Sequence, residues 1–394
     1  MKGIRCHEET AQCLSCHTQA ESPAKHLYSI YDVKDLMNTQ QRFELIKEVG
    51  EEIVTEEELL ELLDKKKNPV AYDGFEPSGQ MHIAQGIMRT INVNKMIKAG
   101  CRFKMWVADW FALMNNKMGG DLERIRTTGD YFIEIWKACG MKTSNIDFVW
   151  AKDVVTKEDH WKTTIDVARN STVKRIVRCS QIMGRKVGES LSAAQIIYPC
   201  MQAADVFHLK CDITQLGMDQ RKVNMLAREV GPKIGFWKPV VVSHHMLLGL
   251  SKPETRSKDP ADMLLEMKMS KSKPDSAIFM TDDEEDIKRK MSKAYCPEGE
   301  TNLNPVLEYC KYMIFERFDE MKIERPAKFG GDVTYKNYEE LEQSFAKKEL
   351  HPMDLKQATS AKINEMLEPV RKHFEKNQKA KELLEEVRSF RVTR

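Results

Sequence analysis

Residues 72–86, YDGFEPSGQMHIAQG, decide the fold class of this 394-residue chain. A short apolar run that starts at Val70 ends here, three glycines and a proline interrupt regular structure, and apolar residues at helical spacing begin at Ile87. This order predicts a strand, a turn and a helix. At such a junction the free N–H groups and the positive end of the helix dipole favour a bound phosphate. Taken alone, the stretch is also compatible with an ordinary strand-to-helix turn.

A second stretch, Lys268-Met269-Ser270-Lys271-Ser272, is cationic and carries hydroxyl groups. Two lysines and two serines in five residues can hold a polyanion by charge and by charge-assisted hydrogen bonds. On its own, such a cluster is usually a solvated surface loop. About 180 residues separate it from the first stretch.

Together, residues 77–85 (PSGQMHIAQ) and residues 268–272 (KMSKS) resemble the paired HIGH and KMSKS motifs of the class I aminoacyl-tRNA synthetases. The second motif matches at every letter. The first keeps His82 and the isoleucine but has Ala84 in place of glycine and Gln85 in place of the second histidine. The long separation suits a fold whose two nucleotide loops come from opposite halves of the chain.

Length and composition predict a protein with two domains and no membrane partner. Apolar residues make up 41% of the chain and charged residues 31%, and no run of about 18 apolar residues is present. A net charge of +2 means that any nucleic-acid contact depends on local basic patches. Most of the ten cysteines lie in apolar patterns and no leader pattern is visible, so we expect a reducing, cytoplasmic location.

Residues 1–38 stand apart as an N-terminal extension with little apolar pattern, expected to be flexible. They contain a Cys13-x-x-Cys16-His17 sequence, which has the form of a haem attachment site or of part of a zinc site. A single pair without a second well-spaced pair of ligands does not define a metal site. We therefore predict no protein-bound metal.

Short apolar segments alternate with helical patterns in residues 39–273, which predicts a doubly wound, Rossmann-like parallel sheet with helices on both faces. Residues 39–67 are expected to be helical, with a capping box from Thr55 to Glu58 opening a second helix. The expected strands are 70–72, 103–108, 148–151, 213–216 and 240–242, and the expected helices are 87–99, 121–139, 159–183, 190–209 and 219–230. Ligands of such sheets bind beyond the carboxyl ends of the strands, where the opening turn, Asp109 and the turn at 216–220 project.

From residue 274 the pattern is helical only, which predicts an all-α C-terminal domain over 274–394. The expected helices are 282–293, 305–315, 337–348 and 355–390. The last one has a core stripe of Leu355, Ile363, Met366, Leu367, Val370 and Phe374.

Tyr198, Gln202 and Asp205 fall on one helical face at spacings of four and seven residues. Polar tips amid apolar neighbours need hydrogen-bond partners, although a helix with a plain polar face is the alternative. The segment YPCMQAAD at 198–205 resembles the YPxxQxxD element of tyrosyl-tRNA synthetases of the archaeal and eukaryotic cytosolic type. Residues 217–222 resemble the GGxDQRK element of that family, with Leu216 at the first glycine.

The resemblance implies roles for these residues. Tyr72 and Asp205 would bind the hydroxyl of a substrate tyrosine, and Tyr198, Gln202 and Gln220 its ammonium and carboxylate. The catalytic residues would be His82, Lys268 and Lys271. The ATP site would comprise Gly74, Gly79, His82, Gln85, Gly86, Gly217, Asp219, Met269, Ser270 and Lys271, and magnesium would arrive with ATP.

The same family resemblance implies contacts with tRNA(Tyr) and a homodimer packed through about 120–200. Basic residues of one predicted helix and its end would contact the acceptor stem: Lys174, Arg175, Arg178, Arg185 and Lys186. Arg178 and Arg221 would face the first base pair, while Phe329, His351 and Asp354 would contact the anticodon.

The implied reaction is adenylation of L-tyrosine by ATP followed by transfer to tRNA. Tryptophanyl-tRNA synthetase is the nearest alternative, but the Tyr72 and Asp205 pair suits a hydroxyl better than an indole N–H. A free-standing adenylyltransferase would leave the helical domain unexplained. A catalytically silent RNA-binding relative is the remaining alternative, and intact His82, Lys268 and Lys271 argue against it.

Overall fold

A six-stranded sheet with strand order β1-β6-β5-β2-β3-β4 organises the N-terminal two thirds of the chain. The computed structural model describes residues 37–184, 190–252, 269 and 274–390. The strands are β1 (Glu52–Val54), β2 (Val70–Phe75), β3 (Arg102–Val107), β4 (Ile146–Trp150), β5 (Ile213–Thr214) and β6 (Val240–Ser243). β2 pairs in parallel with β3 and with β5, so the sheet is parallel except for β1, which runs antiparallel to β6 at the edge.

The predicted parallel sheet and its five strands are confirmed, but β1 lies in a range that we expected to be helical. Residues 39–67 contain two helices separated by this strand. The second begins at Glu56, and the hydroxyl of its N-cap, Thr55, accepts from the Glu58 amide at 3.2 Å. This is one half of the predicted capping box; the Glu58 carboxylate instead accepts from Arg228 and Lys238. A three-residue strand carries too little alternation to be recognised in sequence. The sheet edge supplies the backbone partners that hold it, from Glu52 opposite Ser243 to Val54 opposite Val241.

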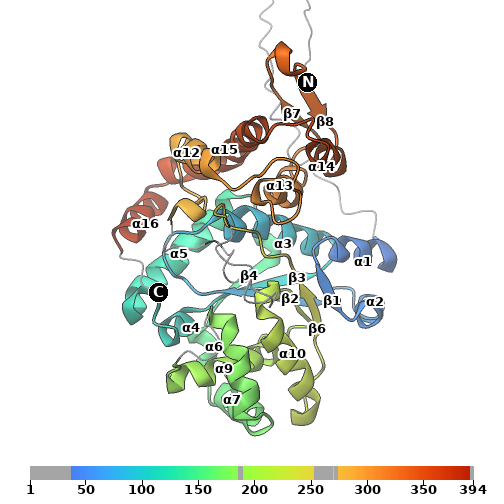
Figure 1. Cartoon of the computed structure of the whole chain (residues 1–394). Helices are drawn as coiled ribbons and strands as arrows, with labels where there is room; N and C mark the ends of the chain where they lie inside the picture. Colours follow the sequence, from blue (N-terminus) through green and yellow to red (C-terminus); the bar gives the residue numbers. More distant parts are fainter. Residues whose placement is uncertain (1–36, 185–189, 253–268, 270–273, 391–394) are drawn as a thin grey trace, which may run out of the picture. The chain divides into compact units, whose positions relative to one another are not determined.

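Helices cover both faces of the sheet (Figure 1). They are α1 (Thr39–Lys47), α2 (Glu56–Lys65), α3 (Arg89–Lys98), α4 (Asp109–Met114), α5 (Leu122–Ala138), α6 (Lys152–Val155), α7 (Glu158–Arg169), α8 (Val173–Cys179), α9 (Ala193–His208) and α10 (Arg221–Val230). α3 and α5 lie on one side, and α9 and α10 on the other. The predicted doubly wound arrangement is therefore confirmed.

The core beneath α9 is built from aromatic and aliphatic side chains of widely separated segments. Trp106, Phe111, Phe207 and Leu226 are all at most 3% exposed and belong to one apolar cluster. Burying each such side chain stabilises the fold by about 1.5–3 kcal/mol relative to leaving it exposed. This cluster also contains Tyr72, so the apolar core reaches the side chains expected at the ligand site.

The C-terminal part is helical, with two departures from the prediction. Its helices are α12 (Glu284–Lys293), α13 (Pro305–Tyr309), α14 (Tyr338–Ala346), α15 (Pro352–Lys376) and α16 (Gln378–Ser389). The single helix expected over 355–390 is broken at Asn377, which ends α15 and caps α16 by accepting from the Ala380 amide. An antiparallel pair, β7 (Met321–Ile323) and β8 (Val333–Tyr335), was not predicted. The six-residue core stripe of α15 is buried as predicted.

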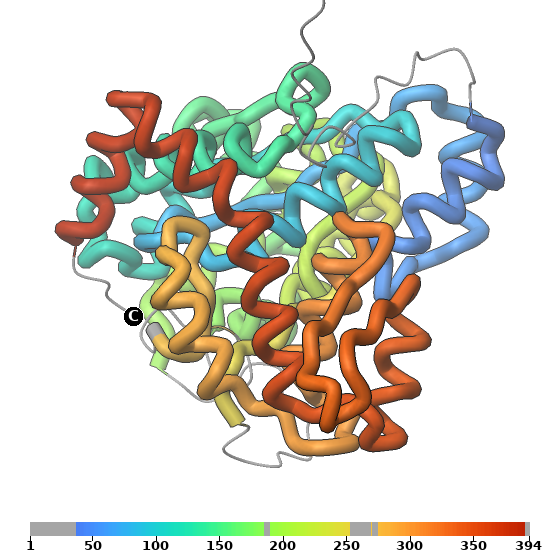
Figure 2. Tube along the Cα trace, turned by 90° about the horizontal axis from the view of Figure 1, so that it is seen from above, coloured from blue at the N-terminus to red at the C-terminus, as the bar shows by residue number. Residues whose placement is uncertain are grey.

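Residues Asn38–Arg394 form one compact unit, in which the C-terminal helices pack on the sheet-covering helices. α16 lies against α5 (Figure 2). His373 of α15 is 2.8 Å from Glu134 of α5. The boundary near residue 273 stays a prediction. Among the described residues, no helix is both long and apolar enough to cross a membrane.

Candidate active site

The turn after β2 is paired with the chain that follows the second motif. The Ile83 amide donates to the Ile278 carbonyl at 2.8 Å, the Met280 amide donates to the Met81 carbonyl at 2.9 Å, and His82 bridges to Phe279. The segment at 278–280 begins a few residues after the second motif. Lys268, Ser270 and Lys271 lie outside the described residues, while Met269 is buried.

The helix after this turn begins earlier than predicted, and it begins as a π-helix. η2 (Ala84–Met88) precedes α3, and Gly79 turns the chain at a φ of +99°. Gly86 has no room for a side chain, because a Cβ there would lie 2.2 Å from Met280 Sδ. π-helical turns are rare and often mark functional sites. A side chain at 86 would therefore force the buried Met280 side chain to move, whatever the turn binds.

Gln85, which replaces the second histidine of the first motif, is tied to the fold through its backbone. Its carbonyl accepts from Trp136 Nε1 at 2.8 Å, while its buried side-chain Oε1 has no hydrogen-bond partner among the described residues. An amide oxygen in this state is ready for a donor from a ligand.

Tyr72 and Asp205 lie in the same buried region, as the sequence predicts. They are 1% and 0% exposed, and the Tyr72 hydroxyl and Asp205 Oδ2 have no hydrogen-bond partner among the described residues. Burial raises the pKa of Tyr72 well above 10, and the Asp205 charge raises it further. The Gln202 amide lowers this pKa, although it forms no hydrogen bond with the Tyr72 hydroxyl. Burial raises the pKa of Asp205 to about 6. Two such atoms are costly unless a ligand satisfies them.

His160 of α7 was not predicted as a site residue. Its Nε2 lies 2.8 Å from Asp205 Oδ1, and both side chains are fully buried. The residue sits inside a helical pattern, and only the folded chain brings it to Asp205, 45 positions away.

Tyr198 points at a carboxylate that the sequence analysis also missed. Its hydroxyl donates to Glu76 Oε1 at 2.7 Å, Asn115 Nδ2 donates to both Glu76 oxygens at 3.1 and 3.2 Å, and Lys117 Nζ lies 3.8 Å away. Burial raises the pKa of Tyr198 well above 10. Glu76 belongs to the stretch 72–86, and its position next to the turn could have identified it as a site residue. It gives the region an anionic group suited to an ammonium.

Gln202 and Gln220 are brought together as predicted. Gln202 Nε2 donates to Gln220 Oε1 at 3.1 Å, and Gln220 Nε2 donates to the Ile182 carbonyl at 2.9 Å. The pair joins α9 to η6 (Met218–Gln220), the turn that carries Asp219. Its two amides lie at the carboxyl edge of the sheet.

A buried charge network lies beneath this edge and had no sequence signal. Arg89 Nε is 2.9 Å from Asp73 Oδ2, and the guanidinium also donates to Gln215 and contacts His244 at 2.6 Å. Burial raises the pKa of Asp73 to about 6 and, helped by Arg89, lowers that of His244 well below its usual value. The Met218 amide donates to the His244 carbonyl at 3.0 Å. The network therefore ties the end of β2 to the turn at 217–220.

Asp109 projects from the carboxyl end of β3 as expected, but its carboxylate is used within the protein. Its Oδ1 accepts from the Trp110 and Lys152 amides, and Oδ2 is 3.0 Å from Arg126 Nε. In the parts of the chain that the structure describes, no group of three or more His, Cys, Asp or Glu side chains forms a metal site. The Cys/His sequence of the first 36 residues lies outside those parts.

The residues predicted to contact tRNA lie on several elements. Arg178 is exposed on α8, whereas Arg221 makes a two-point ion pair with Glu52, at 2.5 and 2.9 Å. Arg175 pairs with Glu229. Arg185 and Lys186 lie outside the described residues.

Arg325 links the two segments that contain Phe329 and Asp354. Phe329 is 61% exposed at the end of η10 (Ala327–Phe329), and Asp354 lies in the first turn of α15, which His351 caps. Arg325 donates to the Gly331 carbonyl at 2.9 Å and to the carbonyl of Glu349, near the start of α15, at 2.9 Å. The two predicted anticodon segments therefore share one anchor.

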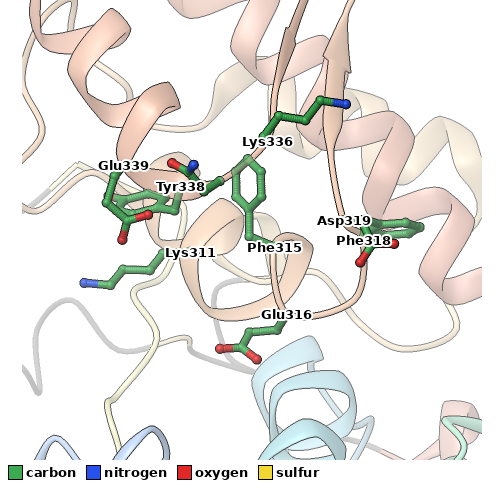
Figure 3. A pocket seen from close by; sticks show the side chains of 9 residues that line it. Lys311, Phe315, Glu316, Phe318, Asp319, Lys336, Tyr338 and Glu339 are labelled. Carbon is green, nitrogen blue, oxygen red and sulfur yellow. The ribbon is translucent and has the colours of Figure 1, made fainter.

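A surface pocket in the C-terminal part contains none of the predicted site residues (Figure 3). It is lined by Lys311, Phe315, Glu316, Phe318, Asp319, Lys336, Asn337, Tyr338 and Glu339. Glu316 points away toward α3, where it pairs with Lys95 at 2.6 Å, and Lys336 pairs with Glu320. These pairs neutralise much of its charge, and we assign the pocket no function.

Comparison with known proteins places this site in a family. The family model described as tRNA synthetases class I (W and Y) matches residues 64–368. The chain is 51% identical over 358 residues to tyrosine–tRNA ligase 1, cytoplasmic, of Arabidopsis thaliana, covering 90% of each. It is 50% identical over 384 residues to tyrosine–tRNA ligase 2, cytoplasmic, of the same plant, covering 97% of this chain but only 49% of that relative. The chain thus spans about half the length of the second relative.

A solved structure agrees. Tyrosyl-tRNA synthetase from Pyrococcus horikoshii, complexed with L-tyrosine, superposes with a TM-score of 0.83 at 39% identity, covering 90% of this chain and all of that one. The chain therefore belongs to the class I tRNA synthetases. Within that class it is a member of the tyrosine–tRNA ligase family.

Proposed function

We propose that this protein activates L-tyrosine with ATP and transfers the tyrosyl group to tRNA(Tyr). In the first step a carboxylate oxygen of tyrosine bonds to the α-phosphorus of ATP, and the bond from that phosphorus to the bridging oxygen breaks, releasing pyrophosphate. In the second step the terminal ribose hydroxyl of tRNA attacks the tyrosyl carbonyl and AMP leaves. No side-chain nucleophile takes part, so catalysis rests on positioning and charge stabilisation.

The observation that carries this proposal is the pair of unsatisfied buried atoms, the Tyr72 hydroxyl and Asp205 Oδ2. A phenol bound between them would donate to the carboxylate and accept from the Tyr72 hydroxyl. Phenylalanine would leave both atoms unpaired, which is why such a site rejects an analogue that lacks the hydroxyl. An indole N–H would satisfy the carboxylate alone, so the pair favours tyrosine over tryptophan.

The other end of the amino acid has complementary groups nearby. Glu76, held by Tyr198 and Asn115, is the anionic partner for an ammonium. The Gln202 and Gln220 amides, 3.1 Å apart, are suited to the substrate ammonium and carboxylate. This assignment adds Glu76 to the residues expected from sequence.

ATP with magnesium is proposed to bind over the turn after β2. Gly79, His82, Gln85 and Gly86 would face the phosphates and ribose, with Gly74 beside them, while Gly217 and Asp219 would approach the ribose from η6. Met269 and Ser270 would belong to the same ATP site. Lys268 and Lys271 would contact the leaving pyrophosphate, where positive charge stabilises the transition state. The metal would come with the nucleotide and be held chiefly by its phosphates.

Three further assignments belong to this proposal. Arg178 and Arg221 would contact the acceptor stem, and Phe329, His351 and Asp354 the anticodon, by stacking and hydrogen bonding of unpaired bases. A homodimer through 120–200 is supported by exposed apolar side chains of Trp161, Ile165, Val173 and Ile197, which are 39–71% exposed. The names of the plant relatives support a cytoplasmic location.

A pyrophosphate-exchange assay with each amino acid tests the activity. We expect exchange with tyrosine that exceeds exchange with phenylalanine or tryptophan by several powers of ten, followed by charging of tRNA(Tyr). Exchange that prefers tryptophan would identify the tryptophan enzyme instead. No exchange with any amino acid from a folded protein would indicate a silent RNA-binding relative.

A further inference from the structure

Asp205 is held from behind by a histidine on a neighbouring helix. His160 Nε2 lies 2.8 Å from Asp205 Oδ1, and neither side chain has any exposed surface. α7, which carries His160, packs directly on α9, which carries Asp205. With one carboxylate oxygen engaged by the imidazole, only Oδ2 remains for a ligand.

The His160 imidazole is packed between α7 and α9, and its Nδ1 has no hydrogen-bond partner among the described residues. Thr164 Oγ1 donates to the His160 carbonyl at 2.9 Å within α7. On the outer side, the His208 ring lies 5.1 Å from the His160 ring, and His208 Nε2 is 2.9 Å from Thr163 Oγ1. His160 is therefore the inner member of a packed pair of imidazoles between α7 and α9.

The contact has a defined chemical effect on Asp205. Burial raises the pKa of Asp205 to about 6, and the hydrogen bond and charge of His160 oppose that rise. The other titratable groups that interact with the carboxylate are Tyr72 from β2, Tyr198 from α9 and Cys211 after α9, and burial keeps all three neutral. His160 is the one neighbour in the described chain that stabilises the ionised carboxylate.

We propose that His160 is a positioning residue for tyrosine selection: its imidazole holds Asp205 Oδ1 and so aims Oδ2 at the hydroxyl of the substrate. This inference rests on the proposed function, in which that hydroxyl is the ligand of Asp205. An imidazole that donates to Oδ1 sets the rotation of the carboxylate and keeps it an acceptor. Selectivity then depends on a residue that does not touch the amino acid.

Three variants test the role. His160→Leu removes the donor, and His160→Gln retains an N–H at a similar reach. Thr164→Val is the control, since it removes a buried hydroxyl of α7 that bonds only the backbone carbonyl of His160 and leaves the imidazole beside Asp205. Each is assayed by tyrosine-dependent pyrophosphate exchange over a pH range, with KM and kcat measured separately and phenylalanine as the competing substrate.

We expect His160→Leu to raise the KM for tyrosine about tenfold or more, with a smaller change in kcat, because a buried acceptor is left unsatisfied. Selectivity over phenylalanine should fall by a similar factor. The loss of tyrosine binding on acidification should move to higher pH, since removing His160 raises the pKa of Asp205 further. His160→Gln and Thr164→Val should stay near wild type in KM and selectivity.

Wild-type KM and selectivity in His160→Leu would overturn the proposal, and so would equal losses in His160→Leu and His160→Gln. If the leucine variant does not fold, His160→Asn replaces it, because its amide is too short to reach Asp205. Loss in the asparagine variant with retention in the glutamine variant supports the proposal, and equal behaviour of the two overturns it. A wild-type protein without tyrosine-dependent exchange would instead refute the proposed function.

Discussion

The Ile83 amide donates to the Ile278 carbonyl at 2.8 Å, which joins the turn after β2 to the segment that follows the second motif. The two motifs are about 180 residues apart in sequence, yet this contact sets the first beside the chain that leaves the second. A nucleotide held by both motifs would therefore depend on the packing around residues 278–280.

Gly86 provides a direct test of that packing. Gly86→Ala would place a methyl group 2.2 Å from Met280 Sδ, in a site where Met280 is fully buried. We expect a loss of about 1–3 kcal/mol in the free energy of unfolding and weaker ATP binding, measured by chemical denaturation and pyrophosphate exchange. In a Met280→Ala background the same change should cost clearly less, because the clash is relieved. If the two substitutions lower the free energy of unfolding additively, Met280 does not impose glycine at 86.

His245 predicts a pH-dependent stability. It lies 3.0 Å from Glu51 and 3.1 Å from Glu308, stacks on Tyr312 at 4.2 Å, and its pKa is raised to about 9 because these carboxylates outweigh the effect of burial. A histidine with a raised folded-state pKa stabilises fully below its unfolded pKa, about 6.5, and that stabilisation is lost as pH rises through 9. We expect its contribution to reach at most about 3 kcal/mol.

The measurement is the free energy of unfolding of wild type and His245→Gln between pH 6 and 10. The two proteins should differ most at pH 6 and converge near pH 10. A difference that stays constant across this range would show that His245 does not titrate between the two carboxylates.

Asp354 should separate tRNA charging from amino-acid activation. Asp354→Ala removes a carboxylate from the first turn of α15, far in sequence from the residues assigned to tyrosine and ATP. We expect near-normal pyrophosphate exchange and at least tenfold slower tRNA charging, because a carboxylate that accepts from a base is lost. Glu339→Ala, at the start of α14, is the matched control and should affect neither assay. Equal loss of both activities in Asp354→Ala would refute an anticodon role.

The assignment of the dimer can be tested at Val173. Its side chain is 71% exposed at the first position of α8, and a charge there would be desolvated in an interface. Val173→Asp should shift the solution mass measured by light scattering from dimer toward monomer. Met353→Asp, at an apolar site 42% exposed outside the predicted interface, should leave the mass unchanged. An unaltered dimer in Val173→Asp would place the interface elsewhere.

The sequence predicted the elements that carry a local pattern. The apolar runs at β2, β3 and β4 were recognised because parallel strands are buried on both faces. The helix with Tyr198, Gln202 and Asp205 was recognised by its spacing. β1 and the β7–β8 pair escaped because each strand has three residues and is defined by its partner.

The missed site residues are those whose role depends on contacts between distant segments. His160 is one of several polar residues in an amphipathic helix, and nothing local distinguishes it until α7 packs on α9. The role of Arg89 was missed for the same reason, because its partners Asp73, Gln215 and His244 come from three other segments. Glu76 was within the first stretch quoted, but its link to Tyr198 spans 122 residues.

The most direct test of the account is the selectivity of Tyr72→Phe and Asp205→Asn in pyrophosphate exchange with tyrosine and with phenylalanine. For the wild type we expect a ratio of kcat/KM of about 10⁵, a magnitude adopted from tyrosyl-tRNA synthetase, the enzyme that defines it, and not calculated from the geometry. Tyr72→Phe removes the phenol hydroxyl, and Asp205→Asn removes the carboxylate charge. The kcat/KM ratio of each variant should therefore fall at least about tenfold. If both variants retain the wild-type ratio, Tyr72 and Asp205 do not select the substrate.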